Sequence, residues 1–206
     1  MQKNTQTIMQ WIWITIFASV LTWSGINPHD NFTWFLEVVP ALVGFVVLAI
    51  TRKSFPLTPL LYMLILIHSI ILMVGGHYTY AEVPLFDWIK DALNQSRNNY
   101  DKLGHFAQGF VPVMIAREIF IRKNIINGKI WLSFLSICFA LAFSAFYELI
   151  EWWVALASGE DAEAFLGTQG YIWDTQSDMA VALIGAIIAI LVLSRWHDKQ
   201  LNDSGD

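Results

Sequence analysis

Long apolar runs are the feature that most constrains how this 206-residue chain can fold. Each run covers roughly 17–25 residues, which is enough for a helix to cross a hydrocarbon core about 30 Å thick. Only 14% of the residues are charged, compared with about 25% in soluble domains. The sequence therefore predicts an all-α, polytopic membrane protein that forms a single transmembrane domain over residues 1–206.

Six transmembrane helices are expected from the positions of the runs, at about 8–26, 34–51, 60–75, 103–121, 130–157 and 175–196. The first run has no A-x-A-like cleavage site and is followed by further apolar runs, so we interpret it as an uncleaved helix. The segment at about 85–93 has apolar and charged residues on opposite sides of a helix. This pattern predicts a short interfacial helix on the bilayer surface.

The basic residues distinguish the two ends of the predicted bundle. Nine of the twelve Lys and Arg residues lie in the N-terminus, the second and fourth loops and the tail, and three lie in the 76–103 connection. Cytoplasmic loops carry the excess of basic residues. Both termini are therefore expected in the cytoplasm. Residues 100–106, 147–153 and 173–179, which lie at one end of each of the last three helices, are expected on the outer side.

These three stretches, YDKLGHF, YELIEWW and WDTQSDM, carry ionisable residues at helical spacing within or beside apolar runs. An ionisable side chain in a transmembrane segment is by default a candidate functional residue. At about 100° per residue, each helix presents its ionisable residues on one stripe. Six residues are expected to converge as a candidate catalytic site: Asp101, His105, Glu148, Glu151, Asp174 and Asp178.

Several chemistries fit such a group. Asp101 can orient His105, four residues later, as a general base, while a neighbouring carboxylic acid acts as the general acid. A divalent metal is a second option, with His105, Glu148, Glu151 and Asp178 as its candidate ligands. A proton or cation relay, or a purely structural network of paired charges, uses the same residues.

Other polar residues receive simpler interpretations. Lys102 points away from the stripe of Asp101 and is expected to extend toward the interface. Asp174 is expected to cap its helix, and His77 is a candidate to reach the site from the side. The remaining expectations are a core position for His68, loop or tail positions for His29 and His197, and a solvated acidic loop with Glu160, Asp161 and Glu163.

The longest polar and aromatic segments carry a family resemblance. GGHYTYAEVPLFDW (75–88), SRNNYDKLGHFAQGFVP (96–112), SAFYELIEWW (144–153) and FLGTQGYIWDTQSDM (165–179) are similar to the YjdF family of bacterial inner-membrane proteins. The resemblance implies a six-helix, multi-pass protein of the inner membrane and brings no assigned activity with it. The family often has an acidic residue where this chain has Tyr171, so Tyr171 is not expected to be a required ligand or acid.

A more distant similarity is to VanZ-like membrane proteins. These proteins have an Asp-Lys-x-x-His helix start, followed by a Glu and an Asp-rich helix start, and this chain has Asp101 to His105, Glu148 and Asp174 to Gly185 in the same order. VanZ-like proteins are linked to glycopeptide resistance and the cell envelope. The similarity implies an envelope-related role by analogy.

The leading hypothesis is a membrane protein with an outward-facing polar pocket that binds or modifies a lipid-like or cell-envelope substrate. The expected partners are the bilayer and such a substrate, not nucleic acid. A small proton- or ion-coupled transporter is an alternative, although Ser133 and Ser136 are almost the only polar residues noted in the inner halves of the last three helices. A non-catalytic assembly or sensing protein is another, so the sequence leaves enzymatic activity open.

Overall fold

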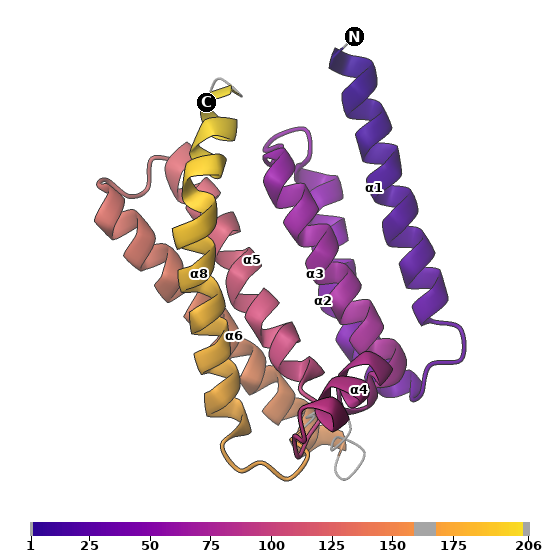
Figure 1. Ribbon diagram of the computed structural model, residues 1–206. Coiled ribbons are helices and arrows are strands. Elements are labelled where there is room, and N and C mark those ends of the chain that lie inside the picture. Colours follow the sequence, from indigo (N-terminus) through magenta and orange to yellow (C-terminus); the bar gives the residue numbers. More distant parts are fainter. Residues whose placement is uncertain (1, 159–167, 204–206) are drawn as a thin grey trace.

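The computed structural model describes residues 2–158 and 168–203, and this part of the chain is helical and has no β-strand (Figure 1). Its long helices are α1 (Gln2–Ser24), α2 (Asn31–Thr51), α3 (Pro59–Tyr78), α5 (Tyr100–Arg122), α6 (Lys129–Ser158) and α8 (Asp174–Asp203). The connection between α3 and α5 contains the 3₁₀ turn η1 (Tyr80–Glu82) and the short helix α4 (Pro84–Ala92). The acidic residues Glu160, Asp161 and Glu163 lie outside the described residues.

Five of the long helices are both long enough and apolar enough to cross a membrane, namely α1, α2, α3, α6 and α8. α5 has 23 residues but is not one of these five, because it carries charged and polar residues along its length. It is also the most enclosed helix, since it packs against α3, α6 and α8. Its polar side chains therefore face protein and not the surroundings of the bundle.

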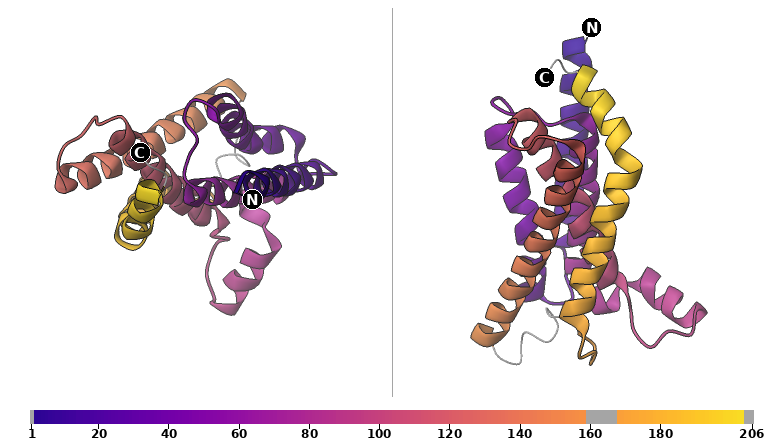
Figure 2. Two further views of the ribbon diagram at one scale, coloured as in Figure 1. Left: turned by 90° about the horizontal axis from the view of Figure 1, so that it is seen from above. Right: turned by 90° about the vertical axis from the view of Figure 1, so that its left-hand side faces the viewer.

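The long helices run side by side as two groups, α1–α3 and α5, α6 and α8, which meet where α3 packs on α5 (Figure 1). Both termini lie at the same end of the bundle, and α4 projects sideways near the opposite end (Figures 1 and 2). A cluster of buried apolar residues from α3, α5, α6 and α8 joins the two groups, and it includes Leu61, Met114 and Ala186. A second cluster joins α1, α2 and α3 around Phe17, Val38 and Met73.

Close approach of α5 and α8 depends on small residues. A Cβ atom on Gly109 of α5 would lie 1.7 Å from the carbonyl oxygen of Ala182, and one on Gly185 of α8 would lie 2.3 Å from that of Phe106. Ala182, Gly185 and Ala189, which lie on one face of α8, are buried here. The two backbones thus touch, which places the first turn of α8 beside the first turns of α5.

Two differences from the expected helices have clear physical causes. α8 continues seven residues past the expected end at 196, because His197 is fully buried and Leu201 packs inside the bundle. The assignment of His197 to a solvated tail was therefore wrong. α4 begins one residue before its expected start at about 85, because proline is favoured at the first position of a helix and Pro84 takes that place.

The start of α2 illustrates how a polar loop residue fixes a helix end. Asp30 is the N-cap, and its Oδ1 accepts a 2.6 Å hydrogen bond from the backbone N–H of Thr33. This bond lowers the pKa of Asp30 below its ordinary value, so the carboxylate contributes stability that is lost as the pH falls through that lowered pKa. We expect Asp30→Ala to lower the free energy of unfolding by about 1 kcal/mol at neutral pH. Denaturant unfolding at pH 7 and pH 3 checks this, and Asp30→Asn, which keeps the cap, should behave like the parent protein.

Candidate functional site

The six residues expected to converge lie at the end of the bundle opposite the termini, where α5 and α8 begin and α6 ends. All of them are buried: Asp101, His105, Glu148, Glu151, Asp174 and Asp178. Two cations, Arg97 and Lys102, lie among them. We call these eight residues the polar cluster.

Lys102 is the centre of the ion pairs in the polar cluster. Its Nζ donates to Asp174 Oδ1 at 2.7 Å and to Asp178 Oδ1 at 2.6 Å. Arg97 Nη1 donates to the same Asp174 oxygen at 2.6 Å. The expectation that Lys102 extends away from the site was wrong, because α8 packs so closely on α5 that two of its carboxylates come within reach of the lysine.

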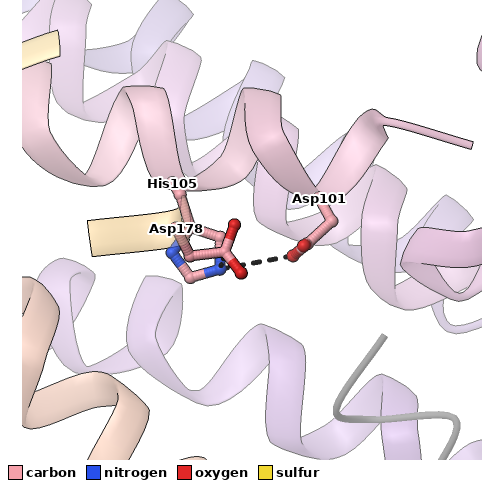
Figure 3. Close-up of side chains that lie close together, drawn as sticks. All are labelled: Asp101, His105 and Asp178. Carbon is pink, nitrogen blue, oxygen red and sulfur yellow. Dashed lines mark ion pairs between the residues drawn. The ribbon is translucent and has the colours of Figure 1, made fainter. Parts of the chain in front are cut away.

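His105 lies between carboxylates from α5, α6 and α8, of which Asp101 and Asp178 are drawn in Figure 3. Its Nε2 is 3.3 Å from Asp101 Oδ1 and 3.8 Å from Asp178 Oδ1. On the other side of the ring, Nδ1 is 3.0 Å from Gln108 Oε1 and 3.6 Å from Glu148 Oε1. An amide oxygen only accepts hydrogen bonds, so Nδ1 is the donor to Gln108, and Nε2 faces the two aspartates.

Within the polar cluster, the negative charges of Glu148 and Glu151 have fewer cationic neighbours than those of the aspartates. Glu148 Oε1 is buried and has no hydrogen-bond partner, although the side chain is only 7% exposed. Within the described ranges, its ion-pairing neighbour is His105. Glu151 lies one helical turn further along α6 and faces a cavity. Such a half-satisfied group is costly in apolar surroundings unless a proton or a ligand completes it.

Three potential metal ligands lie close together in the described part of the chain. One ligand atom each from Asp101, His105 and Asp178 lies within 4.8 Å of the other two. Two of the four metal ligands predicted from the sequence, His105 and Asp178, are in this group. Asp101 replaces Glu148 and Glu151 in it, and Glu148 lies against the opposite nitrogen of His105.

A cavity of about 500 Å³ adjoins the polar cluster and extends between α2, α3, α5 and α6. At the cluster end its wall includes Glu37, Asp101, His105 and Glu151. Toward the end that carries the termini, the lining is mainly apolar, with Val47, Leu48, Leu57, Val111, Pro112, Ile115, Ile119 and Phe143. The cavity is therefore polar at the end next to the polar cluster and apolar along most of its length.

Glu37, Arg97 and Tyr147 were missed as candidate residues. Glu37 of α2 is buried and shares the cavity wall with Asp101. The signal was available, since Glu37 is an acidic residue inside an apolar run. Arg97 and Tyr147 carried no comparable signal, because one precedes its helix and the other is a common aromatic neighbour of the bilayer interface.

The other histidines differ in their positions. His77, a candidate for the site, instead bonds through Nδ1 to the backbone oxygen of Ser24 at 3.0 Å and packs on Trp23, so that expectation was wrong. His68 lines the cavity, and His29 pairs with Glu82 at 3.2 Å. None of these three lies within 4 Å of a carboxylate of the polar cluster in the described structure.

A second buried polar group lies near the termini, where the sequence suggested little besides serines. Arg117 Nη1 donates to His197 Nδ1 at 2.8 Å, so the other ring nitrogen carries the proton and donates to Glu118 Oε2 at 2.9 Å. Glu118 also accepts from the Thr58 hydroxyl at 2.8 Å and from Arg122 at 3.0 Å. This group ties α3, α5 and α8 together, and both oxygens of Glu118 and both ring nitrogens of His197 are hydrogen-bonded, as expected for a structural network.

Comparison with known proteins agrees with the helical architecture. The family described as "Predicted membrane protein (DUF2238)" matches residues 9–199. The inner membrane protein YjdF of Escherichia coli (strain K12) is 53% identical over 186 residues, which cover 90% of this chain and 89% of the relative. No solved structure matches the chain significantly.

Proposed function

The chain belongs to the DUF2238 family of predicted membrane proteins, and we propose that it binds a lipid-like molecule of the inner membrane in the cavity beside the polar cluster. The polar head of the ligand would lie at Glu37, Asp101, His105 and Glu151. Its hydrocarbon tail would extend along the apolar wall between α2, α3, α5 and α6.

The cavity is the observation that carries this proposal. Its volume of about 500 Å³ is within the range of small-molecule sites, about 300–1,000 Å³. A ligand that matches its lining needs a polar end and a long apolar part, which is the chemistry of a membrane lipid. Because three of the four helices around the cavity, α2, α3 and α6, are apolar enough to cross a membrane, such a ligand can reach it without crossing water.

We further propose that α5 is the sixth membrane-spanning helix of a single domain and that both termini are cytoplasmic. Its 23 residues correspond to about 34 Å of helix, and its position among α3, α6 and α8 explains why it can carry polar residues. The distribution of nine Lys and Arg residues against three supports this orientation. The polar cluster would then lie at the outer leaflet.

His105 is the residue best suited to act on a bound head group, should a reaction occur. It faces the cavity, and Gln108 Oε1, 3.0 Å from Nδ1, orients its ring, with Asp101 Oδ1 3.3 Å from Nε2. The pair can accept a proton from a hydroxyl group in the ligand, with a nearby protonated carboxyl as the acid. Binding does not depend on this chemistry, which makes binding the first property to test.

Gly44 of α2 offers a way to fill the cavity without disturbing the fold. It lines the cavity, and a Cβ atom there would meet no atom within 4 Å. We expect Gly44→Leu to remove most of the lipid that co-purifies with the protein in mild detergent, as measured by mass spectrometry of extracted lipids. The matched control is Val43→Leu at the exposed neighbouring position. Equal lipid content in both variants and the parent would contradict a lipid site in the cavity.

Transport is a second candidate function because of the length of the cavity. Its lining continues past the apolar wall to Thr51, Ser54 and Lys123, near the end that carries the termini. A lipid-like molecule could therefore move along it between leaflets. A translocation assay in vesicles would detect this, and Gly44→Leu should then reduce translocation as well as binding.

A further inference from the structure

We propose that Asp101, His105 and Asp178 bind a divalent transition-metal ion, such as Zn²⁺ or Mn²⁺, in the wall of the cavity. The inference concerns the same cluster as the proposed lipid site but does not require a lipid. It would make the polar cluster a metal centre with one side open to whatever occupies the cavity.

The spacing of the three side chains is the first argument. Two ligands that are each about 2.1 Å from a metal at a tetrahedral angle are about 3.4 Å apart. His105 Nε2 lies 3.3 Å from Asp101 Oδ1 and 3.8 Å from Asp178 Oδ1. These separations exceed the 2.7–2.9 Å of a charge-assisted hydrogen bond, and they match a shared ion more closely than a direct bond.

The tautomer of His105 is the second argument. Gln108 Oε1, 3.0 Å from Nδ1, accepts the Nδ1 proton and leaves the lone pair of Nε2 directed toward Asp101 and Asp178. A bare lone pair that faces two carboxylates is repelled, so Nε2 needs either a proton or a metal ion between it and the two aspartates. Metal-binding histidines are usually oriented in this way, by a hydrogen bond from the nitrogen that does not bind the metal.

The charge balance is the third argument. Six carboxylates, Glu37, Asp101, Glu148, Glu151, Asp174 and Asp178, are buried around two permanent cations, Arg97 and Lys102. Glu148 Oε1 has no hydrogen-bond partner and points at the His105 ring from 3.6 Å. Asp101 Oδ2 accepts no hydrogen bond, and its nearest cations are Arg97 Nη2 at 3.6 Å and Lys102 Nζ at 3.8 Å. A divalent cation beside His105 reduces this excess of negative charge.

Lys102 does not block the ion. It lies 2.6 Å from Asp178 Oδ1, but a carboxylate offers about four lone-pair sites, so Asp178 can serve both cations. Asp101 and His105 line the cavity, whereas Asp178 lies behind them. The fourth coordination position would therefore face the cavity, and an open position of this kind is typical of sites that bind a substrate or water.

The test is the metal content of the full-length protein in detergent, after loading with Zn²⁺ or Mn²⁺ and removal of excess metal. We expect about one ion per chain in the parent protein and a reduction of about tenfold or more in His105→Ala and Asp101→Asn. His68→Ala is the matched control, since His68 lines the same cavity but forms no ion pair within 4 Å in the described ranges; it should load like the parent. Equal loading of His105→Ala and the parent, or a parent that takes up neither ion, would overturn the proposal.

Two further measurements separate the possible causes of a negative result. Co²⁺ bound to one imidazole and two carboxylates has a visible absorption spectrum that changes when the histidine is removed, and His105→Gln should lose this spectrum even if it folds normally. Lipid content is measured on the same samples. Lipid without metal would overturn the metal site alone, whereas metal without lipid would leave the metal site intact and contradict the lipid site.

Discussion

Lys102→Met is expected to lower the free energy of unfolding by about 3–5 kcal/mol, because removing one partner of a buried ion pair leaves the other charges uncompensated. Lys102 Nζ donates to both Asp174 and Asp178, whose side chains are buried. Methionine has a similar length and keeps the apolar contacts of the lysine stem, so the loss reports on the charge. Denaturant unfolding in detergent micelles, followed by tryptophan fluorescence, measures the effect.

The control for this variant is Lys90→Met on α4. Lys90 pairs with Asp87 at 2.9 Å, but at the surface, where ion pairs contribute little. No measurable change is expected there. Combining Lys102→Met with Asp178→Asn should recover part of the lost stability, because the second change removes one of the orphaned carboxylates. If Lys102→Met were as stable as Lys90→Met, the ion pairs of the polar cluster would not hold α5 and α8 together.

Gly109→Ala is expected to be the most destabilising single-methyl addition in the described structure for which a geometric reason is clear. The added Cβ would lie 1.7 Å from the Ala182 carbonyl oxygen, and backbone atoms on both helices would have to separate. Overpacking of side chains alone costs about 1–3 kcal/mol, so a clash with backbone is expected to cost more than about 3 kcal/mol. Loss of the folded protein in gel filtration, or a strongly reduced melting temperature, would report it.

Gly44→Ala is the matched control for Gly109→Ala. It makes the same chemical change in another long helix, at a position where no atom lies within 4 Å of the new Cβ. Alanine loses less conformational entropy than glycine on forming a helix, by about 0.5–1 kcal/mol, so this variant should be as stable as the parent or slightly more stable. A similar loss in both variants would show that tolerance of a methyl group in this bundle is not set by the α5–α8 contact.

The effects of Gly109→Ala and Lys102→Met also bear on the candidate site. The first turns of α5 and α8 meet only because Gly109 and Gly185 allow the backbones to touch. Asp178 comes within 3.8 Å of His105 at this contact. A variant that separates the helices should therefore lose metal loading in parallel with stability, whereas Lys102→Met is expected to keep the ligand side chains of the proposed metal centre.

The sequence by itself determined which segments become helices. An apolar run forms a helix because its side chains favour the membrane over water, and because a helix satisfies the backbone hydrogen bonds within the segment itself. Both are local properties of the segment. The expected helices therefore agree with α1 to α8 to within a few residues at most ends. The same local property explains why acidic residues and His105 within apolar segments could be identified as unusual before their neighbours were known.

The tertiary structure alone decided which of these groups meet. Hydropathy does not specify which helix faces touch, and the path of a long side chain depends on what lies within its reach. The side chain of Lys102 points toward α8 because α8 packs against α5 there. Glu37 is part of the site because α2 lines the same cavity. His197 lies in a buried network and not in the expected tail, because Arg117 and Glu118 of α5 bond to its two ring nitrogens. Which side chains pair in a helix bundle is set by contacts between segments that are distant in sequence. The sequence could therefore identify the carboxylates of the candidate site, but not the residues that pair with them.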